Sequence, residues 1–156
     1  MTVGIYKQAA RDIMTKHVDT IRSNETVHDA LLLMAENRVS SLPVVNSAGH
    51  CVGVVSQSDL IDLAREADSE NDEGRNEYSY FLFKDVALDE VTTERIDEVM
   101  SDDVISARPD EPVVAVAEKI VTSGVHHLPV CDEDNRLLGI ISTVDILRSL
   151  LAPISV

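Results

Sequence analysis

The sequence predicts a mixed α/β (α+β) fold made of two copies of one motif. Residues 14–60 and 100–146 align without a gap at a shift of 86 positions, and 12 of the 47 aligned positions are identical. In each copy, short apolar runs alternate with segments whose apolar residues recur at helical spacing. Two copies are too few for a solenoid. We therefore expect two pseudo-twofold-related units that share one core.

Each copy is predicted to run strand, helix, strand, strand, helix. In the first copy, residues 18–22 (VDTIR) form the predicted first strand. The helix that follows is expected to begin at Thr26, with Asp29 in its first turn, and to end near Asn37. The apolar stripes that predict this helix and its counterpart in the second copy are Val27, Ala30, Leu31 and Met34, and Val113, Val116, Ala117 and Ile120.

The remaining elements of each copy are a strand pair and a closing helix. In the second copy, Pro112 is expected at the first position of the first helix and Gly124 just beyond its end. Two apolar runs separated by a polar turn come next, LPVV and CVGVV in one copy and LPVC and LLGII in the other, which predicts antiparallel strands. The apolar residues of the closing helices are Leu60, Ile61 and Ala64, and Ile146, Leu147, Leu150 and Leu151.

The segment between the copies has no counterpart in the repeat. It begins with an acidic stretch, ADSENDEGRNE, which is typical of a solvated loop. It continues as YSYFLFK, which holds four of the five aromatic residues: Tyr78, Tyr80, Phe81 and Phe83. Such a cluster is expected to be covered, by the chain's own core, in a dimer contact or as a flap over a ligand. The predicted organisation is copy one at 10–66, a linker at 67–94 and copy two at 95–153.

Composition excludes several classes of function. The formal charge is −15, from 28 acidic and 13 basic residues, which argues against nucleic acid as a partner. The acid excess fits either an ordinary acidic surface or a salt-adapted source. No apolar run approaches the length of a membrane span and the first residues lack a signal-peptide core, so we expect a cytoplasmic protein without membrane insertion. Cys51 and Cys131 align with aliphatic residues of the other copy, which predicts buried free thiols and neither a zinc site nor a secreted disulfide framework.

The duplicated order, the LPV strand and the recurring ending GVVSQSD (53–59) and GIISTVD (139–145) resemble a tandem pair of CBS domains, also called a Bateman module. The resemblance covers both copies and leaves out the linker and the extreme ends, so a stand-alone CBS-domain protein is expected. It implies that the cleft between the copies binds adenosine-containing nucleotides.

The resemblance also assigns roles to the shared motif. Ser56 and Ser142 would approach a phosphate or ribose, while Asp59 and Asp145 would accept hydrogen bonds from ribose hydroxyls. A Ser followed three residues later by an acid is also a capping box, so a structural role is the alternative. The two glycines of the motif, Gly53 and Gly139, would allow a close backbone approach because they carry no Cβ.

The copies differ just before the LPV strand. Copy one has Ser40 and Ser41, and copy two has His126 and His127. Related modules, such as the γ subunit of AMP-activated protein kinase, place basic residues here against phosphate, so the resemblance implies an anion-binding role for the histidines. Structural or exposed histidines, or a metal site, are the alternatives. We predict one tight and one weak site, with binding of anions improving as the pH falls toward about 6.5.

These patterns predict a regulatory binding module. The ligand would be AMP, ADP or ATP, with Mg²⁺ for the polyphosphates and Arg22 and Arg108 as either counter-charges or solvated strand ends. S-adenosylmethionine or another adenosyl ligand, or a scaffold with empty clefts, are the alternatives. No catalytic motif is present, so we expect no enzyme activity. The partners would be an effector protein (an enzyme, transporter or channel) and a second copy, in a homodimer formed through the closing helices.

Overall fold

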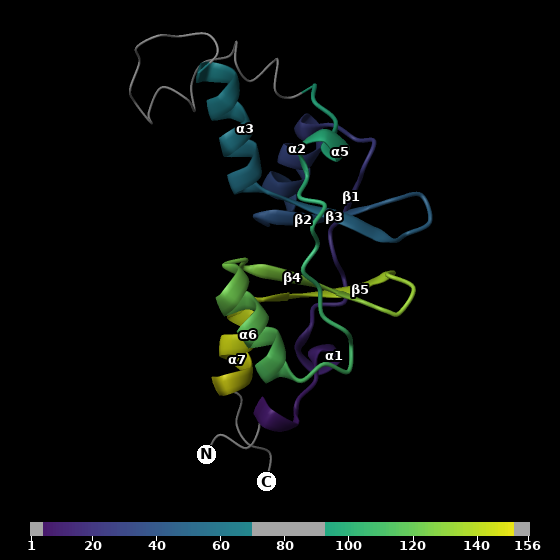
Figure 1. The fold of residues 1–156 in the computed structure, drawn as a ribbon, viewed down its shortest axis with the longest axis vertical. Coiled ribbons are helices and arrows are strands. Elements are labelled where there is room, and N and C mark those ends of the chain that lie inside the picture. Colours follow the sequence, from purple (N-terminus) through teal and green to yellow (C-terminus); the bar gives the residue numbers. More distant parts are fainter. Residues whose placement is uncertain (1–4, 70–92, 152–156) are drawn as a thin grey trace. The chain divides into compact units, whose positions relative to one another are not determined.

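The computed structural model describes residues 5–69 and 93–151 of the chain (Figure 1). The aromatic cluster and most of the predicted linker lie outside these ranges. The described elements are η1 (Ile5–Lys7), α1 (Ala10–Ile13), β1 (Ile21–Arg22), α2 (Val27–Asn37), β2 (Ser41–Val45), β3 (Cys51–Ser56), α3 (Gln57–Ser69), α5 (Ile96–Val99), α6 (Val113–Ser123), β4 (His127–Cys131), β5 (Leu137–Ser142) and α7 (Thr143–Leu151). No helix within the described ranges is long and apolar enough to cross a membrane.

The mixed helix and strand class is confirmed, and copy one has the predicted order of elements. β1, β2 and β3 form one sheet in that order, with β1 parallel to β2. α2 begins after Thr26 because the hydroxyl of Thr26 accepts a hydrogen bond from the Asp29 backbone N–H, while the Asp29 carboxylate accepts one from the N–H of Thr26. The first strand is shorter than predicted, spanning only Ile21 and Arg22.

Copy two lacks a full first strand, and a proline explains the difference. In copy one the N–H of Ser23 donates to the carbonyl of Val45, which lengthens the pairing of β1 with β2. The equivalent residue in copy two is Pro109, which has no N–H to donate. The pairing there reduces to one parallel bridge between Ala107 and Val130. β4 and β5 pair antiparallel, as predicted.

The ends of α2 and α6 show the same backbone geometry. Gly124 ends α6 with a φ of 72°, and the equivalent Arg38 ends α2 with a φ of 55°. Both residues adopt the left-handed conformation that commonly terminates a helix. Pro112 has an extended ψ of 139° and lies just before α6 rather than at its first position.

The chain folds into two compact units that do not coincide with the two copies. Among the described residues, unit 1 comprises 5–18, 47–51 and 103–151, and unit 2 comprises 19–46, 52–69 and 93–102. The leading segment of each copy therefore belongs to the unit built mainly by the other copy. In Figure 1, the purple α1 lies with the green and yellow elements of unit 1, and the green α5 lies with the blue elements of unit 2.

Equivalent backbone hydrogen bonds hold the two exchanged segments. In unit 1, the N–H of Ala10 donates to the carbonyl of Glu111 over 2.8 Å. In unit 2, the N–H of Ile96 donates to the carbonyl of Glu25 over 2.9 Å. The donors and the acceptors are each related by the shift of 86. The exchange is thus a property of the duplicated motif, and it occurs in both directions.

Each unit has its own buried cluster, whereas the sequence led us to expect one shared core. The cluster in unit 2 contains Ile21, Val27, Ala30, Met34, Leu42, Val44, Val55, Leu60, Ala64 and Ile96, and the cluster in unit 1 contains Ala10, Ala107, Val116, Ile120, Leu128, Val130, Ile141 and Ile146. The predicted helical stripes supply the helical part of both clusters. Of the apolar residues predicted on the closing helices, Leu60, Ala64 and Ile146 are buried, while Ile61, Leu147, Leu150 and Leu151 are exposed.

Candidate functional site

The predicted Ser and Asp of copy one meet at the junction between β3 and α3 in unit 2. Asp59 Oδ2 accepts hydrogen bonds from the N–H and the hydroxyl of Ser56, over 2.8 and 2.9 Å. Ser56 Oγ in turn accepts the N–H of Asp59 over 3.3 Å. Both side chains are partly buried. The arrangement is a complete capping box, formed by Asp instead of the usual Glu or Gln.

The junction between β5 and α7 in unit 1 repeats this geometry. Asp145 Oδ2 accepts from the N–H and the hydroxyl of Ser142, over 2.8 and 2.9 Å, and Ser142 Oγ accepts the N–H of Asp145 over 3.2 Å. The structural alternative for the motif is therefore realised in both copies. It leaves open whether the same atoms also bind a ligand.

The hydrogen bonds of the capping box limit what the motif offers a ligand. A serine hydroxyl has one proton, and both serines give it to Oδ2 of the aspartate. Neither hydroxyl can donate to a phosphate without losing this bond, although each can accept one more hydrogen bond. For Asp59, none of the hydrogen bonds within the described residues uses Oδ1. That oxygen remains able to accept a hydroxyl donor such as those of a ribose.

The second pair of predicted residues in copy one lies beside this junction. The N–H of Gln57, the first residue of α3, donates to the carbonyl of Ser40 over 2.9 Å. Ser41 begins β2 and is only 8% exposed. Its Oγ has no hydrogen-bond partner among the described residues. A buried hydroxyl without a partner is energetically costly, so Ser41 Oγ is a candidate contact for a bound molecule.

The two histidines occupy the equivalent place in unit 1. The carbonyl of His126 accepts the N–H of Thr143 over 3.0 Å, and His127 is the strand partner of Ser142. His126 is exposed and His127 is half-buried. Burial and the neighbouring His126 lower the pKa of His127, and Asp145 partly opposes this shift. His127 is therefore neutral at neutral pH and gains its charge at a lower pH than an exposed histidine.

One further charged position differs between the units and was missed at the level of sequence. Arg148 Nη1 lies 3.8 Å from Oδ1 of Asp145, one turn along α7. The residue at the equivalent position in copy one is Asp62, which follows Asp59 on α3. The signal lies two residues beyond the aligned ranges, where the same shift of 86 positions pairs one charge sign with the other. The edge around Asp145 is consequently more positive than the edge around Asp59.

The glycines of the motif have a structural explanation. A Cβ on Gly53 would lie 2.5 Å from the sulfur of Met100, and a Cβ on Gly139 would lie 2.6 Å from the sulfur of Met14. Both distances are far below a normal contact. Each glycine therefore makes room for a methionine that belongs to the exchanged segment of the other copy. The predicted close approach is made by the protein itself.

The arginines Arg22 and Arg108 lie at the far ends of the strands. Arg22 is the strand partner of Val45, the last residue of β2. Arg108 Nη1 donates to the carbonyls of Cys131 and Asp132. His127 and Cys131 are the two ends of β4, which are about 13 Å apart in an extended strand. The structure thus gives neither arginine the role of a counter-charge beside the histidines or serines.

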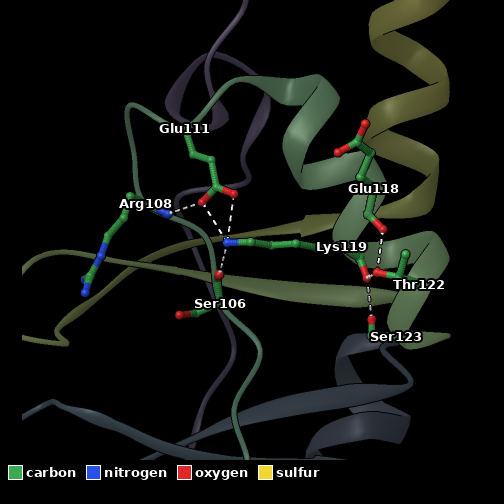
Figure 2. Close-up of polar contacts among 7 residues, drawn as sticks. All are labelled: Ser106, Arg108, Glu111, Glu118, Lys119, Thr122 and Ser123. Carbon is green, nitrogen blue, oxygen red and sulfur yellow. Dashed lines mark hydrogen bonds and ion pairs between the residues drawn. The ribbon is translucent and has the colours of Figure 1, made fainter.

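In unit 1, a lysine contacts the segment 106–111, which contains the residue that bridges to β4, Ala107 (Figure 2). Lys119 Nζ, on α6, lies 2.7 Å from Glu111 Oε1 and donates to the carbonyl of Ser106 over 2.9 Å. Glu111 also accepts the N–H of Arg108, whose side chain points away from the lysine in Figure 2. The equivalent of Lys119 in copy one is Leu33. A leucine cannot make these contacts, so the lysine contacts that hold residues 106–111 in unit 1 have no equivalent at Leu33.

Within the described ranges, no group of three or more His, Cys, Asp or Glu side chains could hold a metal ion. The predicted site residues form one set in each unit. Unit 2 brings together Ser40, Ser41, Ser56 and Asp59, and unit 1 brings together His126, His127, Ser142 and Asp145.

Comparison with known proteins places these features in a family. The CBS-domain profile matches residues 10–66 and 96–152. The chain is 36% identical to homoserine O-acetyltransferase of Methanococcoides burtonii over 137 residues, which are 88% of this chain and 23% of that protein. It is 34% identical to subunit γ-3 of the 5′-AMP-activated protein kinase of Bos taurus over 122 residues, which are 78% of this chain and 22% of the subunit. The chain thus spans less than a quarter of the length of either relative.

Solved structures share the fold. The crystal structure of protein MJ1225 from Methanocaldococcus jannaschii matches with a TM-score of 0.74 and 30% identity, covering 92% of this chain and 48% of that one. The CBS-domain pair of protein MJ0100, solved with 5′-methylthioadenosine and S-adenosyl-L-methionine, matches with a TM-score of 0.68 and 27% identity, covering 90% and 94%.

Proposed function

The chain belongs to the CBS-domain family, and from this premise we propose that it is a regulatory module that binds adenosine-containing ligands and signals their presence to another protein. The observation that carries the proposal is the pair of identical Ser–Asp junctions, each with a distinctive polar edge beside it. The proposed ligand contacts are Ser40, Ser41, Ser56 and Asp59 in unit 2, and His126, His127, Ser142 and Asp145 in unit 1.

The chemistry of each junction suits a nucleoside. In unit 2, Oδ1 of Asp59 remains able to accept a hydrogen bond from a ribose hydroxyl while Oδ2 holds the cap. Ser41 Oγ is buried without a partner in the described part of the chain, and a ligand atom would satisfy it. In unit 1, the ring N–H groups of the histidines and the Arg148 guanidinium can donate to phosphate oxygens. The CBS-domain pair of MJ0100 binds adenosyl compounds, which supports the same ligand class here.

The charge difference between the units refines the proposed ligand class. Unit 1, with two histidines and Arg148, favours a phosphate-bearing ligand such as AMP. Unit 2 has two serine residues and Asp62 at the equivalent positions, which favour a neutral or positively charged adenosyl compound such as S-adenosylmethionine. Mg²⁺ would reduce the repulsion between ATP and this acidic chain.

The boundaries and partners are part of the proposal. We retain residues 10–66 and 95–153 as the repeats and 67–94 as the linker between them. The exposed face of α7, which includes Leu147, Leu150 and Leu151, is the proposed surface for a second copy. The relatives carry CBS domains within longer proteins named as an enzyme and a kinase subunit, so the effector is proposed to be an enzyme or kinase-like assembly.

The proposal is tested by separating ligand binding from helix capping. Asp59→Asn and Asp145→Asn, combined in one variant, are expected to reduce the affinity for AMP and S-adenosylmethionine at least tenfold in calorimetry. Asp29→Asn is the matched control, because Asp29 caps α2 through the same hydrogen bonds to Thr26, and α2 is not one of the two helices that begin at the Ser–Asp junctions. Asp29→Asn should lower the free energy of unfolding by about as much as each of the other two substitutions does, and it should leave the affinity for both ligands unchanged.

A thermal-shift panel gives an independent readout. A ligand at 100 times its dissociation constant should add about 2.7 kcal/mol to the stability of the wild-type chain. Unchanged affinity in the double variant, or no stabilisation by any adenosyl compound, would favour the alternative of a scaffold whose sites stay empty.

A further inference from the structure

The two cysteines of the chain meet in unit 1, although they come from different copies. Cys51 is the first residue of β3 and is 2% exposed, and Cys131 is the last residue of β4 and is fully buried. No disulfide joins them. Their side chains are close enough to hydrogen-bond to each other. Residues 47–51 belong to unit 1 while the rest of β3 belongs to unit 2, so Cys51 is the last residue of unit 1 before the chain crosses.

Backbone hydrogen bonds hold both cysteines in place. The N–H of Cys51 donates to the carbonyl of Asn135 over 3.0 Å, and the Asn135 side chain donates to the carbonyl of Cys51 over 2.7 Å. The N–H of Cys131 donates to the carbonyl of Ala107 over 3.0 Å, and Cys131 pairs with Leu137 across β4 and β5. The contact between the thiols therefore follows from the fixed positions of two backbone segments and does not depend on mobile side chains.

The pairing of two thiols is not imposed by the duplication. Cys51 aligns with Leu137 of the other copy, and Cys131 aligns with Val45. An aliphatic side chain thus serves at both equivalent positions, and packing alone requires no sulfur at either one. Two cysteines that replace no sulfur of the other copy, and whose thiols lie within hydrogen-bonding reach of each other in the fold, suggest a chemical use for the pair.

We propose that Cys51 and Cys131 form a reversible disulfide within the chain when it is exposed to a peroxide or to a small-molecule disulfide. With a peroxide, one thiolate attacks an oxygen, the O–O bond breaks and a sulfenic acid forms. The second thiol then attacks that sulfur, the S–S bond forms and water leaves. With glutathione disulfide, a mixed disulfide forms first, and attack by the second thiol releases a second molecule of reduced glutathione.

The environment of the pair makes this reaction slow. The hydrogen bond with Cys51 and burial both raise the pKa of the Cys131 thiol. The reactive thiolate is therefore scarce at neutral pH, and the rate should increase as the pH rises. Equilibrium, reached after long incubation, is a better measure of the proposal than the rate is.

The test compares the equilibrium in the folded and unfolded chain. The protein is incubated in glutathione buffers of graded redox ratio, in native buffer and in urea, quenched with acid and alkylated with N-ethylmaleimide under denaturing conditions. Chains with the disulfide carry no adduct and reduced chains carry two. Because the fold holds the thiols together, the equilibrium constant for disulfide formation should be at least 100-fold larger in the native chain than in urea.

Two controls assign the product. Cys51→Ser and Cys131→Ser should each retain one alkylatable thiol and form no intramolecular product, and a non-reducing peptide map of the wild type should link the two cysteine-containing peptides. Thermal unfolding supplies a second readout, because a fold that favours the disulfide must be stabilised by it. The oxidised wild type should melt at a higher temperature than the reduced form, and neither variant should gain this stabilisation.

A native equilibrium constant equal to or below the one in urea would overturn the proposal, as would disulfides found only between chains. This outcome is independent of ligand binding. The proposed function would stand if the cysteines stayed reduced, and the disulfide would stand if no adenosyl compound bound.

Discussion

Units 1 and 2 have the same Ser–Asp junction but different edges beside it. In both, an aspartate in the first turn of the closing helix caps the helix through the preceding serine, with hydrogen bonds that differ by no more than about 0.1 Å. Around this shared junction, unit 1 has His126, His127 and Arg148, where unit 2 has Ser40, Ser41 and Asp62. The duplication kept the atoms that start the helix and varied the charges beside them.

The difference teaches where selectivity would reside. The capping atoms are constrained by folding, so they can contribute to affinity but cannot distinguish one adenosyl ligand from another. The edge residues are partly or fully exposed, apart from Ser41, and few of their side chains are needed by the fold. An exposed charge contributes only a few tenths to about 1 kcal/mol to the free energy of an ion pair. The selectivity between anionic and cationic ligands should therefore be modest, and the contributions of the single edge residues should add.

The largest expected effect tests the feature that the units share. Gly53→Ala and Gly139→Ala should each destabilise the chain by about 2 kcal/mol in urea unfolding, because the new Cβ meets a methionine sulfur and a backbone carbonyl. Met100→Ala should relieve part of the loss in Gly53→Ala but none in Gly139→Ala, and Met14→Ala should do the opposite. The reverse pattern of coupling would contradict the exchange of leading segments.

A smaller effect tests a feature that only unit 1 has. Arg108→Met should cost about 1–2 kcal/mol, because the guanidinium supplies the hydrogen bond to the Cys131 carbonyl that Pro109 cannot. Arg22→Met is the matched control and should cost less than about 0.5 kcal/mol, since the N–H of Ser23 already serves the equivalent carbonyl of Val45. Equal losses in denaturant titrations of the two variants would show that the proline does not account for the difference.

The smallest effect concerns ligand selectivity. Replacing His126 and His127 with serine should weaken AMP binding about three- to tenfold at pH 5.5. Because the pKa of His127 is lowered, its charge is gained only below the usual histidine range, so the wild-type affinity for AMP should rise as the pH falls from 7.5 to 5.5. The variant should show a flatter pH profile. Calorimetry giving parallel profiles would remove the histidines from the anion site.

The sequence predicted those elements whose cause is local. Thr26 and Asp29 marked the start of α2 because a capping box is written in adjacent residues, and the apolar stripes identified the buried faces of both helices. The sequence analysis did not predict the short helices α1 and α5, although the two are related by the same shift of 86 positions. A helix of four residues depends on its contacts with the rest of the unit in which it lies, and these contacts are not visible in the sequence. The exchange of these segments, the substitution of Arg108 for a backbone donor and the meeting of the two cysteines all depend on contacts between distant residues.

The site was predicted to a similar degree. Alignment of the copies brought out the Ser–Asp motif and the contrast between serine and histidine, and the structure places these residues together within each unit. A ligand-binding role for the glycines stays a prediction, and the sequence could not show that a methionine and a backbone carbonyl from a remote segment approach each of them. The opposite charges of Arg148 and Asp62 appear at the same shift, two residues beyond the aligned ranges, but they could not be interpreted until the helical turn placed Arg148 beside Asp145.

The reciprocal placement of α1 and α5 has a consequence for how such a chain arises and how it may be divided. A protein ending at residue 66 would contain α1 without the elements of copy two against which α1 packs, and it would lack α5, which packs with the elements of copy one. Two such fragments could satisfy each other only by trading these helices, as in a domain-swapped pair. Joining two such swapped subunits into one polypeptide would reproduce the reciprocal placement of α1 and α5.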